Sequence, residues 1–120
     1  MAPLVEMTGV RQHRGEPSRR WFACLDADLF VWHQHGRVSR FEFCYGKLYR
    51  ECVLSWSESQ GFHHARIDDG ESNPLRNRTP IEIPDGSYDQ SKIATRFETL
   101  AGGIEPRLYR QLLKLLYAPL

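Results

Sequence analysis

Apolar and polar side chains alternate through residues 37–56, and this two-residue period is typical of a β-strand with one buried face. Gly46-Lys47 interrupts the alternation, and Gly suits the first position of a tight type II′ hairpin turn. The pattern therefore predicts two antiparallel strands, 37–45 and 48–56, joined by that turn. Their shared face carries the side chains of Phe41, Phe43, Tyr45, Leu48, Cys52, Leu54 and Trp56.

The predicted turn also sets the register of this hairpin. With two residues in the turn, Tyr45 faces Leu48 and Phe43 faces Arg50. A one-residue slip would divide the aromatic side chains between both faces, so the pattern selects this register. Asp28 is expected to face Phe43 from the other side. Arg50 therefore either marks a polar corner together with Asp28 or lays its stem over the rings with its guanidinium in water.

A second hairpin turn is predicted at His35-Gly36, just before the same segment. A two-residue turn there would place Phe30 and Trp32 on the aromatic face as well. Further strands are predicted at 21–24, 29–32 and 62–67, with at most an edge strand at 80–84, where prolines limit pairing.

The last third of the chain changes to a helical period. Ser87 followed by Gln90 has the capping-box spacing and predicts a helix to about residue 101, ended by Gly102-Gly103. Pro106 suits the first turn of a second helix, which is expected to reach about residue 117. The sequence thus predicts an α+β fold: a four- to five-stranded antiparallel meander with two C-terminal helices packed on one face.

The second predicted helix is apolar around about half of its circumference, which is wider than a helix lying on a sheet requires. The surplus must be covered by the first helix, by the N-terminal segment or by a second copy of the chain. We expect a homodimer with Tyr109, Leu113 and Tyr117 near its two-fold axis.

Length and composition indicate one domain. The chain has 120 residues, of which 41% are hydrophobic, so it can bury a core of its own. Residues 1–19 are rich in Gly, Pro and Arg and are expected to form a mobile N-terminal arm before a single domain at 20–120. Sixteen basic and fifteen acidic side chains leave a net charge of +1, which argues against a nucleic-acid partner.

Cysteine usage and hydropathy bear on the compartment. Cys24, Cys44 and Cys52 are odd in number and lack C-x-x-C spacing, which favours reduced thiols and a cytoplasmic location. No apolar run approaches the 18 residues of a membrane span, so no membrane role is expected.

Imidazole and carboxylate groups gather at His63, His64, Asp68, Asp69 and Glu71. Such groups can ligate a divalent metal or act as acid and base. Adjacent strand residues point to opposite faces, so only one of the two histidines can serve a given site, and the loop before them leaves open which one. Asp-Gly is also common in turns for backbone reasons alone. No repeated ligand spacing and no Gly-rich phosphate loop occur, so neither a metal nor a cofactor is expected.

Several short motifs resemble those of a family of small uncharacterised bacterial proteins. The similar stretches are 21–22, 28–32, 41–45, 54–56, 61–64, 68–71, 80–81 and 85–86. The resemblance implies a self-contained bacterial domain and brings no activity, substrate or cofactor with it.

Two classes of function fit these observations best, and a nucleic-acid role through the N-terminal arm ranks third. The first is a non-catalytic binding or interaction module. The second is a small enzyme or ligand carrier that uses either the polar segment from His63 to Glu71 or the Asp28 and Arg50 corner. A cavity on which these groups converge would favour the second class.

Overall fold

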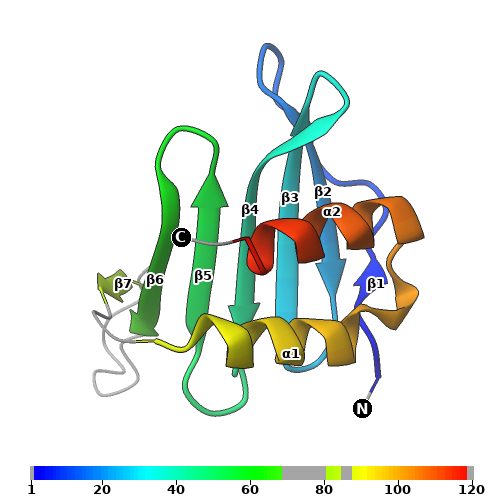
Figure 1. Ribbon diagram of the computed structural model, residues 1–120. Coiled ribbons are helices and arrows are strands. Elements are labelled where there is room, and N and C mark those ends of the chain that lie inside the picture. Colours follow the sequence, from blue (N-terminus) through cyan, green and yellow to red (C-terminus); the bar gives the residue numbers. More distant parts are fainter. Residues whose placement is uncertain (1, 69–80, 85–87, 119–120) are drawn as a thin grey trace, which may run out of the picture.

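The computed structural model describes residues 2–68, 81–84 and 88–118. Within these residues, seven strands form one antiparallel sheet in sequence order, and two α-helices follow them, with a short 3-10 helix between (Figure 1). The predicted α+β meander is confirmed, with seven strands in place of four or five because short edge strands extend the sheet at both sides. The strands are β1 (Val5–Glu6), β2 (Ser18–Ala23), β3 (Ala27–Gln34), β4 (Arg37–Tyr45), β5 (Cys52–Ser57), β6 (Gly61–Asp68) and β7 (Ile81–Pro84). The helices are α1 (Gln90–Leu100), η1 (Ala101–Gly103) and α2 (Pro106–Leu116).

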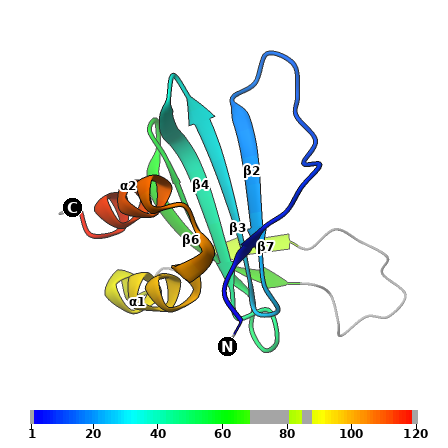
Figure 2. The same cartoon turned by 90° about the vertical axis from the view of Figure 1, so that its right-hand side faces the viewer.

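Both α-helices lie on the same face of the sheet, as expected. Figure 1 shows α1 crossing the sheet from the side of β6 toward β1, and Figure 2 shows α1 and α2 together on one side. The hydrophobic core fills the space between the helices and this face. Its largest fully buried side chains are Phe22, Phe41, Phe43, Phe97, Leu4, Leu29, Leu54, Leu100, Leu112 and Val31.

The predicted pairing of β4 with β5 is wrong in register but right in face. Tyr45 pairs with Cys52, and Phe43 pairs with Leu54 in place of Arg50. The two strands are joined by the longer loop 46–51 and not by a two-residue turn. The backbone of this loop bonds to the segment between β2 and β3, because the Lys47 amide donates to the Asp26 carbonyl at 3.2 Å. The pairing is displaced by four residues, from 48 to 52 opposite Tyr45. An even displacement keeps the side chains of the paired residues on their predicted face, whereas Leu48 lies exposed in the loop.

A β-bulge corrects the prediction for Phe30 and Trp32. The predicted turn at His35-Gly36 is present, and both residues have positive φ (55° and 77°), as a type I′ hairpin requires. His33 pairs with Val38, and the next pair along the strands is Trp32 with Arg40. Ser39 is therefore an extra residue of β4 that has no β3 residue opposite it. The extra residue exchanges the faces. Phe30 and Trp32 therefore lie on the face away from the helices.

The start of the chain is attached to the domain, since β1 pairs with β2 and further contacts lie on either side of it. Leu4 is fully buried, and its amide donates to the Leu100 carbonyl at 2.8 Å. The Gln12 side chain bonds to both the amide and the carbonyl of Arg19, at 2.8 and 2.7 Å. Within the segment expected as an arm, Leu4 thus belongs to the core and β2 begins at Ser18.

The first helix covers part of the apolar surface that the sequence assigns to α2. The Tyr109 ring stacks on Phe97 with centroids 6.0 Å apart, and Leu113 is half-buried against the core. Tyr117 is 52% exposed, and its hydroxyl donates to a Glu98 carboxylate oxygen at 2.9 Å. The sequence left three alternatives for covering the surplus apolar surface of α2: the first helix, the N-terminal segment or a second copy of the chain. The contacts between α1 and α2 show that the first helix covers part of it.

Candidate ligand-binding site

Strand β6 separates the two predicted histidines. His64 pairs with Leu54 and lies on the face covered by the helices, whereas His63 pairs with Ser55 and lies on the opposite face. The tight β5–β6 turn, in which Ser57 pairs with Gly61, sets this register. Asp68 is the last residue of β6, and Asp69 and Glu71 lie outside the described residues.

The predicted corner of Asp28 and Arg50 has a different composition. Asp28 accepts hydrogen bonds from the Trp21 indole nitrogen at 3.0 Å and from the Lys47 ammonium at 2.7 Å. The bond to Asp28 raises the pKa of Lys47. Arg50 is exposed in the β4–β5 loop, and no hydrogen bond or ion pair joins it to Asp28 among the described side chains. The cation beside Asp28 is therefore Lys47.

His64 is the predicted site residue with the most specific surroundings. Its side chain is buried, with 8% exposure, and its Nε2 lies 2.5 Å from the Tyr45 hydroxyl. The Tyr45 hydroxyl donates when Nε2 carries no proton, and the roles reverse in the other tautomer. The Tyr88 ring stacks on the imidazole with centroids 4.7 Å apart. Three segments far apart in the sequence thus meet at His64.

A cavity of about 330 Å³ opens beside this cluster, between the sheet and the beginning of α1. We call it the α1 pocket. Its described lining residues are Tyr45, Cys52, His64, Tyr88, Asp89, Lys92, Ile93 and Arg96. The volume is at the lower end of the range that binds small molecules, about 300–1,000 Å³.

Asp89 explains why α1 begins where it does. Its carboxylate accepts from the amides of Ser91 and Lys92, at 3.0 and 3.3 Å, and from the Ser91 hydroxyl at 2.7 Å. These bonds, the Ser91 hydroxyl bond first, lower the pKa of Asp89. The N-cap is therefore Asp89, whereas the sequence favours Ser87, which lies outside the described residues. Because Asp89 already accepts hydrogen bonds from the first amides of α1, those amides are occupied. Ligand binding in the pocket therefore depends on its side chains.

Two cations, Lys92 and Arg96, line the α1 pocket beside a single described carboxylate, that of Asp89. Lys92 and Arg96 are exposed and four residues apart, on one face of α1. Neither forms an ion pair with any carboxylate that the structure describes, and the carboxylate of Asp89 is engaged in capping. The Arg96 guanidinium lies over the Tyr45 ring, 5.5 Å from its centroid. Positive charge is thus held beside the aromatic rings of the cavity.

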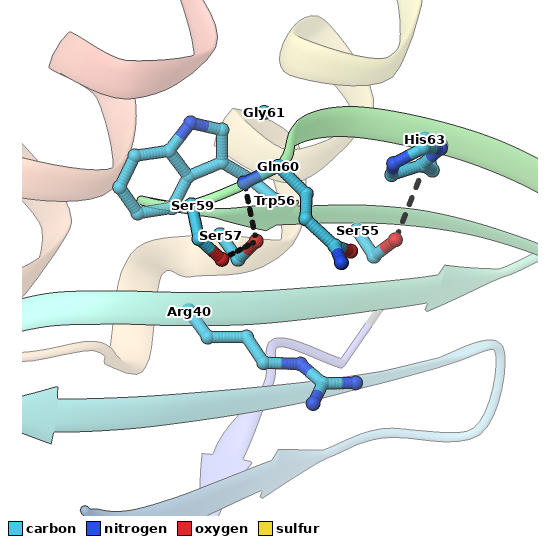
Figure 3. Close-up of a pocket in the computed structure, with 8 residues that line it drawn as sticks. All are labelled: Arg40, Ser55, Trp56, Ser57, Ser59, Gln60, Gly61 and His63. Atoms are coloured by element: carbon cyan, nitrogen blue, oxygen red, sulfur yellow. Dashed lines mark hydrogen bonds between the residues drawn. The ribbon is translucent and has the colours of Figure 1, made fainter.

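His63 lines a second hollow, of about 290 Å³, on the opposite face of the sheet (Figure 3). We call it the open-face hollow. The side chains of Arg40, Ser55 and Gln60 surround it together with His63. The two neighbouring histidines therefore serve two separate cavities.

Sequence reasoning found His64 but missed its partners. The spacing of Lys92 and Arg96 on a predicted helix is a signal that was available. The convergence of Tyr45 and Tyr88 on His64 had no signal, because strand β4 and the segment before α1 are brought together only by the packing of α1.

In the part of the chain that the structure describes, no three or more His, Cys, Asp or Glu side chains are grouped as they would be to hold a metal ion. None of its helices is long and apolar enough to cross a membrane.

No family model, curated protein or solved structure matches this chain. The function proposed below therefore rests on the geometry and charge of the cavities.

Proposed function

We propose that this chain is a non-catalytic binding module that holds a small organic anion in the α1 pocket. The observation that carries the proposal is the excess of positive charge at the cavity: Lys92 and Arg96 line it beside one carboxylate, that of Asp89, which caps the helix, and neither cation forms an ion pair with a described carboxylate. Like charges one helical turn apart repel each other, so a bound anion would relieve that repulsion.

The pocket supports a ligand with an apolar body and an anionic end. Ile93 is buried in the wall, and the rings of Tyr45 and Tyr88 add aromatic surface beside it. An anionic oxygen at the rim would accept hydrogen bonds from Arg96 and Lys92. Each hydrogen bond to a charged group contributes about 1.5–3 kcal/mol. A carboxylate or a phosphate monoester on a small ring has both parts.

Replacement of Arg96 tests this proposal. Benzoate and phenyl phosphate are expected to bind the wild-type protein, and Arg96→Gln is expected to weaken binding about tenfold or more, because a charge-assisted bond is lost. Isothermal titration calorimetry measures both affinities. Arg110→Gln is the matched control, since Arg110 is exposed on α2 and does not line the pocket.

Two results would contradict this proposal. The first is the absence of binding of either probe to the wild-type protein. The second is an unchanged affinity in Arg96→Gln. Benzyl alcohol serves as the neutral probe of similar shape and is expected to bind far more weakly, because it lacks the anionic oxygen.

A catalytic use of the same pocket is the second candidate function. The close contact between the Tyr45 hydroxyl and the His64 imidazole favours it, because such a pair can take or give a proton. Turnover of phenyl phosphate to phenol, lost in His64→Gln, would support the enzyme. Binding of the intact ester without turnover would support the module.

We also propose that the chain forms a homodimer through Tyr109, Leu113 and Tyr117. The apolar surface that α1 leaves on α2 supports this, since Tyr117 is 52% exposed. Light scattering coupled to size exclusion should report a dimer for the wild type and a folded monomer for Leu113→Lys. Leu48→Lys is the control, because Leu48 is 64% exposed in the distant β4–β5 loop. A monomeric wild type at micromolar concentration would refute the dimer.

A further inference from the structure

The face of the sheet away from the helices carries a row of neighbouring aromatic side chains. Trp21 on β2 and Phe30 on β3 have parallel rings with centroids 5.8 Å apart, and Trp32 follows at 6.4 Å from Phe30. The Arg40 guanidinium continues the row, 4.7 Å from the Trp32 ring centroid. The bulge at Ser39 creates this last contact, because it places Arg40 opposite Trp32.

The open-face hollow begins where the aromatic row ends. Arg40 belongs to both, since its guanidinium covers Trp32 and its side chain also lines the hollow (Figure 3). Strands β4, β5 and β6 and the turn between β5 and β6 supply the other walls. An extended ligand that crosses the strands would therefore contact apolar rings first and polar groups next.

The lining of the hollow offers both donors and acceptors. The Ser57 hydroxyl accepts from the Gln60 amide at 3.1 Å and lies 3.5 Å from the Ser59 hydroxyl. The Ser55 hydroxyl donates to the His63 carbonyl at 3.5 Å. The exposed Gln60 side-chain amide adds one acceptor and two donors. Such a mixture matches hydroxyl groups, which donate and accept alike.

The charge around the hollow is balanced. None of its described lining residues carries a carboxylate, and the charge of Arg40 is paired with Glu42 at 3.4 Å. A second ion pair on this face joins Lys47 to Asp28 at 2.7 Å, and Arg19, opposite Trp32, adds one further cation. Binding of a polyanion such as a nucleic-acid backbone requires a clear excess of basic side chains. The described side chains of this face do not supply an excess of that size.

We propose that the open-face hollow binds a neutral saccharide. One sugar ring occupies the hollow and hydrogen-bonds to the side chains of Ser57, Gln60 and His63. A second ring of an oligosaccharide would extend toward the aromatic row at Trp32. The site is independent of the α1 pocket, because the two cavities lie on opposite faces of the sheet and differ in charge.

The experiment is a titration of the wild-type protein with D-glucose, N-acetyl-D-glucosamine and cellobiose, followed by two-dimensional amide NMR. At least one of the three is expected to shift the amide signals of Ser57, Gln60 and His63 with a Kd of about 1 mM. His63→Ala and Gln60→Ala are expected to weaken that binding about fivefold or more, because each loses a hydrogen bond. Both side chains are exposed, so the variants should fold.

The control variant is Gln34→Ala, an exposed change on β3 outside the hollow. It should bind like the wild type. Absence of binding by all three sugars would overturn the proposal, as would wild-type affinity in both hollow variants. Oligothymidylate is titrated in parallel: salt-sensitive shifts of the same amides by oligothymidylate, with none from the sugars, would assign the face to single-stranded nucleic acid instead.

Discussion

Replacing Phe43 by alanine is expected to lower the free energy of unfolding by about 3–5 kcal/mol, the range for a large buried aromatic side chain. Phe43 is 1% exposed in the centre of the sheet. Its ring meets Phe97 edge to face at 5.7 Å and stacks on Tyr45 at 5.5 Å, so it joins the sheet to α1 and to the α1 pocket. The variant loses the buried area and leaves a cavity that its neighbours fill only in part. Urea denaturation followed by circular dichroism measures the change.

Tyr49→Ala is the control for this measurement. Tyr49 is also aromatic, but it is 90% exposed in the β4–β5 loop. Its removal should change the free energy of unfolding by no more than about 0.5 kcal/mol. A loss of less than about 1 kcal/mol in Phe43→Ala would be too small for a fully buried ring and would contradict the core described above.

Gly46→Ala is expected to destabilise the protein by about 2–3 kcal/mol, because it combines backbone strain with a steric clash. Gly46 has a φ of +70°, and a Cβ atom there would lie 2.7 Å from the Arg50 carbonyl oxygen. That oxygen belongs to the backbone, so the loop 46–51 must move to relieve the contact. Urea denaturation again gives the difference from the wild type.

Gly61→Ala separates the two causes in this prediction. Gly61 has nearly the same φ, +72°, but a Cβ there would have no atom within 4 Å. It should therefore cost only the backbone strain, about 1 kcal/mol. Equal losses in the two variants would show that the contact with Arg50 does not constrain the loop.

The faces of the central strands follow from the sequence alone. Alternation assigned Phe41, Phe43 and Tyr45 to one face, and the structure places them there although β5 begins at Cys52. Side-chain direction in a strand depends only on the two-residue period of the backbone, so it survives any even change of register. The same rule placed His63 and His64 on opposite faces.

The helices were also predictable to within a few residues. Gly102-Gly103 follows α1, and Pro106 is the first residue of α2, as the sequence indicates. These signals are local, because glycine and proline limit the backbone at their own positions. The beginning of α1 was not predicted correctly: the sequence favoured Ser87 as the N-cap, whereas the side chain that accepts from the helix amides is that of Asp89.

Only the tertiary structure decided the bulge at Ser39 and the length of the loop 46–51. Both depend on which backbone groups meet across the sheet: the Glu58 amide donates to the carbonyl of Ser39, and the Lys47 amide to that of Asp26. No periodicity in the sequence encodes such a contact. One inserted residue was enough to move Phe30 and Trp32 to the other face, where they form the aromatic row.

The candidate sites divide in the same way. The sequence by itself determined that His64 and its neighbour cannot share a cavity, because strand geometry separates adjacent side chains. It did not determine that Tyr45, Tyr88 and Arg96 surround His64. These residues come from β4, from the segment before α1 and from α1. Their convergence depends on α1 packing across the sheet, which is a property of the whole core and of no single segment.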